Sequence, residues 1–140
     1  MKVVLDTNVL VAGLLSPFGP PGEIVRMAAS DALTLCFDSR ILTEYEDVLS
    51  RPKFPFKPES VHALLDQIRA DGYLVAGEPL ASPLPDPTDQ PFPEVALTGR
   101  AHCLITGNVK HFPSGKCQGM KVLSPTEFLD YYRRKRKSKP

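Results

Sequence analysis

Short apolar runs alternate along the chain with longer stretches in which apolar residues recur at helical spacing. The short runs predict strands at residues 2–5, 33–37, 73–76, 102–106 and 121–123. The longer stretches predict helices at residues 9–16, 23–30, 39–50, 58–71 and 89–100, and from residue 125 onward. This alternation predicts an α/β fold built around a parallel sheet.

Turn and capping residues separate these elements. Asn8 is a predicted cap for the first helix, and the FGPPG segment at residues 18–22 predicts a turn before the second. The prolines near residue 91 fall in the first turn of a helix, where missing N–H groups cost little. Ser124, in the string Ser-Pro-Thr-Glu, predicts the start of the last helix.

The size and composition of the chain fit one ordinary domain. It has 140 residues, of which 42% are hydrophobic and 24% are charged. No apolar run reaches the roughly 18 residues of a membrane span. Asp6 and Asn8 interrupt the first apolar segment, which is therefore not a secretory signal. These features predict a cytoplasmic protein.

The net charge of +1 divides into two opposed parts. The last eight residues, RRKRKSKP, hold 6 of the 17 basic residues and none of the 16 acids, so residues 1–132 have a net charge of −5. We expect a domain at 1–132 and a disordered basic tail at 133–140. Such a tail can contact nucleic acid, although charge alone favours a solubilising or disordered end.

Several kinds of site are absent from the sequence. There is no G-x-G-x-x-G after the first strand and no phosphate-binding loop of the G-x-x-x-x-G-K-[ST] type. The three cysteines lack metal-ligand spacing and are expected to be free thiols. The three histidines are dispersed, and His111 is interpreted as a surface or loop residue.

Acidic residues instead gather where the predicted sheet would place a site, because sites in such folds form at the carboxyl ends of the strands. Asp6 follows the first strand directly, and Asp86 and Asp89 lie in a loop before a later helix. Each has a structural alternative as a helix cap or turn residue. Glu44 and Glu46 both flank the apolar stripe of their helix, and periodicity does not choose between them.

Carboxylates that converge in one cleft repel one another and raise each other's pKa. A divalent cation removes that penalty, and oxygen ligands without Cys or His suit Mg²⁺ or Mn²⁺. Such an ion lowers the pKa of bound water and neutralises phosphate oxygens. The acids therefore point to metal-assisted phosphate chemistry.

The sequence resembles the PIN-domain ribonucleases, which include toxins of toxin–antitoxin pairs, from residue 2 to about residue 132. The resemblance is carried by the strings VVLDTNVLVAGLLS, LTEYEDVLSRPKF, DPTDQPFPEVAL, CLITGNVKHFP and VLSPTEFL. It implies a three-layer α/β/α fold with a central parallel sheet, similar to a Rossmann arrangement. It also implies metal-dependent cleavage of RNA phosphodiester bonds.

The resemblance assigns roles to individual residues. Asp6, Glu44 and Asp89 match the three catalytic acids and metal ligands of the family, which favours Glu44 over Glu46. Thr7 and Asn8 match residues that support the first acid. These five residues lie in the strings quoted above.

Other positions match the family only partly. Asp86 would be an outer ligand or a turn residue. Many relatives have a fourth acid where this chain has Asn108, after Thr106 and Gly107. Thr106 and Asn108 would hold water or a phosphate oxygen. The missing charge should weaken the binding of a second ion, so the resemblance implies one well-bound Mg²⁺ or Mn²⁺ ion and leaves a second open.

Partners follow from the same resemblance. An RNA substrate, a cognate antitoxin protein and a homodimer are expected, with RNA contacts from Lys110, Lys116, Arg133 and Arg134. One alternative is a PIN-fold module with weak or no activity that only binds RNA or protein. Another is a phosphatase with Asp6 as nucleophile, although such enzymes usually have Asp-x-Asp where this chain has Asp6-Thr7-Asn8.

Overall fold

The computed structural model describes residues 1–137 and contains one parallel sheet. Its strands are β1 (Lys2–Leu5), β2 (Thr34–Phe37), β3 (Tyr73–Leu74), β4 (Cys103–Ile105) and β5 (Val122–Leu123). They lie in the order β3-β2-β1-β4-β5, and every neighbouring pair is parallel. The predicted α/β fold with a central parallel sheet is confirmed.

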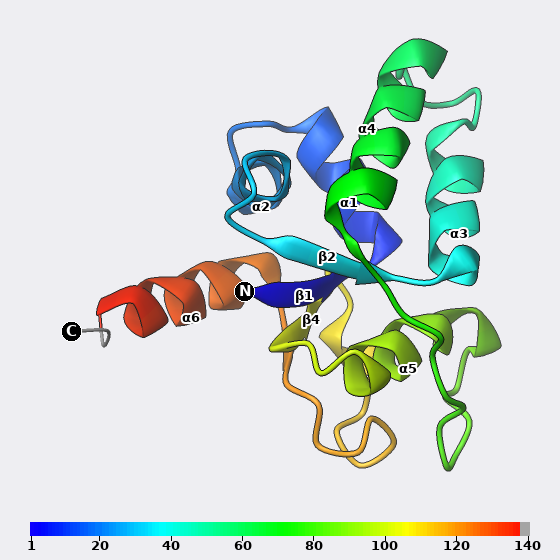
Figure 1. The fold of residues 1–140 in the computed structure, drawn as a ribbon, viewed down its shortest axis with the longest axis vertical. Helices are drawn as coiled ribbons and strands as arrows, with labels where there is room; N and C mark the ends of the chain where they lie inside the picture. The colour runs from blue at the N-terminus through cyan, green and yellow to red at the C-terminus, as the bar shows by residue number, and fades with distance from the viewer. Residues whose placement is uncertain (138–140) are drawn as a thin grey trace.

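Helices cover both faces of this sheet (Figure 1). They are α1 (Thr7–Leu15), α2 (Pro20–Ala29), α3 (Ser39–Leu49), α4 (Pro58–Asp71), α5 (Pro91–Thr98) and α6 (Pro125–Lys137). Short 3₁₀ helices are η1 (Pro87–Asp89) and η2 (Val109–His111). In Figure 1, α1 to α4 lie on one side of the sheet and α5 on the other, where it contacts β1, β2 and β4. The three layers expected from the sequence are therefore present.

The core lies between the sheet and its two helical layers. β1 and β4 are fully buried along most of their length, which explains why their sequences are continuous apolar runs. Tyr45 of α3 and Phe92 of α5 are among the largest buried side chains. Cys36, Cys103 and Cys117 are buried free thiols, as expected.

Parallel pairing brings the carboxyl ends of the strands to one edge. Leu5 is in register with Ile105, and Ile105 with Leu123. The next residue after each of three strands is polar: Asp6 after β1, Asp38 after β2 and Thr106 after β4. This edge is where the site described below is built.

Two helix starts differ from the expectation. α1 begins at Thr7, and the Asn8 side chain accepts a hydrogen bond from the Gly107 N–H (3.1 Å) instead of capping the helix. α2 begins at Pro20, because prolines at the first helical positions lack only N–H groups that have no partner inside the helix. The turn expected over residues 18–22 is thus partly helix.

The last helix starts as expected but extends further. Ser124 Oγ accepts from the Glu127 N–H (3.1 Å), and Glu127 Oε1 accepts from the Ser124 N–H (2.9 Å), which forms a capping box. Residues 133–137, expected to be a disordered tail, are the last turns of α6. Residues 138–140 of that expected tail lie outside the described residues. No helix within residues 1–137 combines the length and apolar character needed to span a bilayer.

Candidate active site

Asp6 stands at the carboxyl end of β1, with its backbone fixed by β4 and its side chain by the residue that follows β4. Its N–H donates to the Ile105 carbonyl (2.9 Å), and Thr106 Oγ1 donates to Asp6 Oδ2 (2.8 Å). The residue is 7% exposed and Thr106 is fully buried. Asp6 occupies the N-cap position of α1 but its side chain makes no capping hydrogen bond. Its carboxylate is therefore directed to the strand edge rather than to the helix.

Glu44 reaches the same edge from α3. The hydroxyl of Thr7, the residue after Asp6, donates to Glu44 Oε2. The neighbouring Tyr45 donates its hydroxyl to the Leu5 carbonyl (2.5 Å), which fixes α3 against the end of β1. Glu46 is instead exposed and lies 4.0 Å from Arg69. The structure thus places Glu44, and not Glu46, beside Asp6.

Asp89 reaches the cluster from the end of η1, just before α5. Its side chain is 13% exposed, and Oδ2 is buried without a hydrogen-bond partner among residues 1–137. The His111 ring lies beside it, with Nδ1 3.5 Å from Oδ2. Burial raises the pKa of Asp89, the charge of Asp86 raises it further, and His111 opposes both. His111 is thus exposed, as expected, yet it contacts a candidate site residue.

Glu44 and Asp89 both act electrostatically on Asp6. Burial is the main cause that raises the pKa of Asp6 from 3.8 to about 6. The Thr106 hydrogen bond lowers it, while the charges of Asp89 and Glu44 raise it. An acidic cluster of Asp6, Glu44 and Asp89 therefore exists at the carboxyl edge of the sheet.

The remaining expected site residues differ in what they contact. Thr106 Oγ1 accepts from the Asn108 N–H (3.0 Å), so it links Asn108 to Asp6. Asp86 is exposed and accepts from the Thr88 N–H (2.9 Å) and hydroxyl (2.8 Å), and these bonds lower its pKa. This geometry is that of a turn residue.

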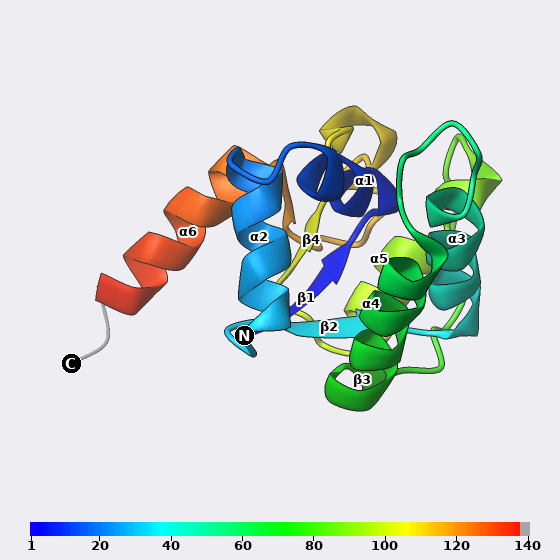
Figure 2. The same cartoon turned by 90° about the horizontal axis from the view of Figure 1, so that it is seen from above.

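The lysines and arginines expected to bind RNA fall in two places. Lys110 lies in η2, next to His111, and Lys116 lies in the loop that follows; both are exposed. Arg133 and Arg134 are on α6, which packs against α2 and leads away from α3 and α5 (Figure 2). Arg133 lies 3.4 Å from Glu23 of α2. The two arginines are therefore remote from the acidic cluster.

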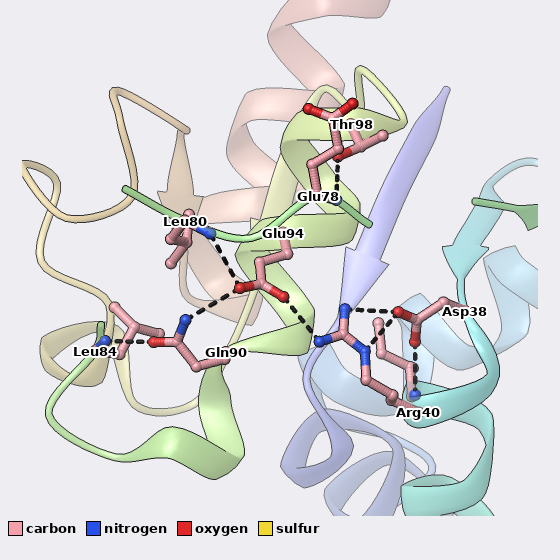
Figure 3. Close-up of polar contacts among 9 residues, drawn as sticks. Asp38, Arg40, Glu78, Leu80, Leu84, Gln90, Glu94 and Thr98 are labelled. Atoms are coloured by element: carbon pink, nitrogen blue, oxygen red, sulfur yellow. Dashed lines mark hydrogen bonds and ion pairs between the residues drawn. The ribbon is translucent and has the colours of Figure 1, made fainter. Parts of the chain in front are cut away.

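A second polar cluster beside the acids was not predicted from the sequence. Figure 3 shows Arg40 between Asp38 and Glu94, with Gln90 on the far side of Glu94. Asp38 follows β2 directly, as Asp6 follows β1. This position after a buried strand could have marked Asp38 as a candidate polar residue at the strand edge. Glu94 is 5% exposed and has no such signal, because its partners come from distant parts of the chain.

The acidic cluster has the chemistry of a divalent-cation site without a complete ligand shell. Within residues 1–137, no three or more Asp, Glu, His or Cys side chains are arranged so that they could hold a metal ion. The donor set is nevertheless all oxygen, and the buried Asp89 Oδ2 lacks a partner. Carboxylate oxygens of this kind suit Mg²⁺ or Mn²⁺, so the donor chemistry of the three acids, rather than their present spacing, fits such an ion.

The parallel sheet, its helical layers and the acids at one edge define an α/β protein of the doubly wound class with a polar site where the strands end. The chain belongs to the PIN domain family, whose model matches residues 2–110. One similar solved structure is that of VapBC2 from Rickettsia felis bound to a DNA fragment from their promoter. It has 17% identity and a TM-score of 0.58, and the match covers 89% of this chain and 98% of that one. No curated protein matches the sequence.

Proposed function

We propose that this protein is a metal-dependent endoribonuclease and the toxin of a toxin–antitoxin pair. Membership of the PIN domain family supports a nuclease. The observation that carries the proposal is the buried Oδ2 of Asp89, which makes no hydrogen bond within residues 1–137 and lies 3.5 Å from His111 Nδ1. It stands in a cluster where burial is the main cause that raises the pKa of Asp6 to about 6. Buried acceptors without hydrogen-bond partners are rare in folded proteins, and a bound ion is one explanation for such a group.

Asp6, Glu44 and Asp89 would hold one Mg²⁺ or Mn²⁺ ion, which supplies a water of lowered pKa and offsets charge on the phosphate. Thr106 holds Asp6 by the 2.8 Å hydrogen bond, and Thr7 holds Glu44. These hydroxyl groups keep two of the three carboxylates oriented before any ligand enters. Such preorientation reduces the reorganisation that binding would otherwise require.

The substrate in this proposal is single-stranded or loop RNA, because exposed phosphates and unstacked bases are reachable there. Lys110, next to His111 in η2, and Lys116 are both exposed and would contact the backbone. The Asn108 N–H donates to Thr106 Oγ1, and the Asn108 side chain would position water or a phosphate oxygen. Arg133 and Arg134 would attract RNA from α6, at a distance from the site.

The proposed biology is that of a cytoplasmic protein neutralised by a cognate antitoxin. The similar solved structure is described as VapBC2 bound to promoter DNA, which supports a partner protein for this chain. A homodimer is part of the proposal by analogy with the PIN family.

Cleavage of a mixed RNA pool by the purified full chain tests the activity. Cutting should require Mg²⁺ or Mn²⁺, and both EDTA and Asp89→Asn should abolish it. Asp47→Asn, an exposed change on α3, is the matched control and should cut as the wild type does. Equal cutting by the wild type and Asp89→Asn would mean contamination and a wrong site assignment.

A binding module without activity is the second candidate, and one observation favours it. Asn108 stands where many relatives have a further acid, so this site has less negative charge than theirs. Under this alternative the wild type binds RNA, measured by fluorescence anisotropy, yet leaves it intact at every metal concentration.

A further inference from the structure

Glu94 is a buried carboxylate with a complete set of partners. It lies in α5 and is 5% exposed. Oε1 accepts from Arg40 Nη1 (2.8 Å), and Oε2 accepts from the Leu80 N–H and from Gln90 Nε2, both at 3.1 Å (Figure 3). A buried charge is tolerated when it is paired in this way. Glu94 therefore connects α5 to Arg40 of α3, to Gln90 and to the backbone at Leu80.

Arg40 in turn is fixed to the start of α3. Its Nε donates to Asp38 Oδ2 (2.8 Å) and its Nη2 lies 2.7 Å from the same oxygen. Asp38 Oδ1 accepts from the Ile41 N–H (3.0 Å), which caps the helix. The guanidinium thus spans from the capped end of α3 to Glu94, and its planar fork favours a single geometry.

This bridge lies next to two of the three acids. Arg40 is four residues before Glu44, one helical turn away on α3. Gln90 follows Asp89 directly and donates to Glu94. The bonds from Asp38 through Arg40 and Glu94 to Gln90 therefore connect the helix that carries Glu44 with the segment that carries Asp89.

The two segments that carry Glu44 and Asp89 need such a connection because these two charges repel. Glu44 lies on α3 and Asp89 at the end of η1, and both are acids on the two segments that the Arg40–Glu94 pair joins. Repulsion between carboxylates favours separation of α3 from the start of α5. A rigid ion-pair bridge opposes that separation.

We propose that Arg40 and Glu94 are positioning residues: their ion pair fixes the spacing between Glu44 and Asp89 and so sets the affinity of the acidic cluster for a divalent cation. This inference rests on the proposed function, since it assumes that the cluster binds a metal. Neither residue is a ligand in it. The bridge acts only through the helices that it joins.

Mn²⁺ titration of the full chain by calorimetry tests this inference, with thermal unfolding measured on the same samples. Arg40→Gln and Glu94→Gln should each weaken Mn²⁺ binding about tenfold, the lower end of the effect of outer-shell partners on metal affinity. The double variant should bind no more weakly than either single variant, because one bridge is lost in all three. Arg51→Gln, which removes an exposed pair with Asp47, should leave the affinity unchanged.

A purely structural bridge gives a different result. The variants would then melt at a lower temperature than the wild type. At temperatures where they are folded, their Mn²⁺ affinity would stay within twofold of the wild-type value, and this result would overturn the inference. Should Arg40→Gln not fold, Arg40→Lys retains the charge without the planar fork and should weaken binding by a smaller factor. A wild type that binds no Mn²⁺ contradicts the proposed function itself, and the inference with it.

Discussion

The hydroxyl of Thr106 donates a 2.8 Å hydrogen bond to Oδ2 of Asp6, from the end of one strand to the end of its neighbour. This bond lowers the pKa of Asp6 against the effect of burial. Thr106→Val keeps the shape but removes the donor, so the pKa of Asp6 should rise above its value of about 6. The free energy of unfolding at neutral pH should fall by about 2 kcal/mol, as for a lost bond to a charged group.

Carboxyl NMR titration and urea unfolding measure these two effects. Thr106→Ser retains the hydroxyl and serves as the control, with a much smaller change expected in both. A Thr106→Val protein in which Asp6 titrates as in the wild type would show that the bond does not stabilise the charged form.

Asp6→Asn should stabilise the metal-free protein at neutral pH. Because the pKa of Asp6 is raised from 3.8 to about 6 in the folded state, the folded protein retains this proton to a higher pH than the unfolded chain. The stability linked to Asp6 is fully present below pH 3.8 and is lost as the pH rises through about 6. At pH 7.5 the neutral Asn should therefore give a gain of roughly 3 kcal/mol as an upper value.

Unfolding in EDTA at several pH values checks this prediction. The advantage of Asp6→Asn should be large at pH 7.5 and should shrink towards zero near pH 4. Asp47→Asn, an exposed change, should show no such trend. An advantage of the same size at both ends of this range would contradict the assignment of a raised pKa to Asp6.

Gly22→Ala should destabilise the fold although alanine favours helices. A Cβ at this position of α2 would lie 2.1 Å from the Pro17 carbonyl oxygen, which belongs to the rigid backbone of the preceding turn. We expect a loss of about 1–3 kcal/mol, typical of overpacking. Gly19→Ala is the matched control, because the nearest atom to its Cβ is 3.8 Å away. In thermal unfolding, Gly22→Ala should melt at a lower temperature than Gly19→Ala. Equal melting temperatures would contradict the close approach of residue 22 to the Pro17 carbonyl.

Charge removal on α6 should weaken RNA binding without affecting the acidic cluster. The variant Arg134→Gln with Lys137→Gln keeps the helix but removes two exposed cations from its last turn. Binding of single-stranded RNA at low salt should weaken, and the slope of log affinity against log salt should decrease by up to about 1.4, or 0.7 for each lost phosphate contact. Mn²⁺ affinity should not change. An unaltered RNA affinity at low salt would mean that these residues do not contact RNA and only increase solubility.

The sheet and much of the acidic cluster could be predicted from the sequence because their signals are local. Continuous apolar runs define β1 and β4, and Asp6 follows β1 directly. Parallel pairing then brings Asp6 and Thr106 to one edge without further information. The choice of Glu44 over Glu46 needed the family resemblance, since both flank the apolar stripe.

Features that depend on distant partners could not be predicted. The Arg40–Glu94 pair joins residues that are 54 positions apart, and neither has a periodic or motif signal. Asn8 was predicted as a cap because Asn is a common one, yet its partner Gly107 is 99 positions away. The basic residues after Tyr132 were expected to be disordered from their charge, but the amphipathic start of α6 carries the helix on through residue 137.

The placement of α6 also affects how the whole molecule behaves in an electric field. Five consecutive cations, residues 133–137, end this helix on one side of the molecule, while α3 and α5 with their acids lie on the other (Figure 1). The protein is therefore an electric dipole, although its net charge is only +1. At low ionic strength a polyanion in solution would turn this dipole before any contact forms and would meet the end of α6 first.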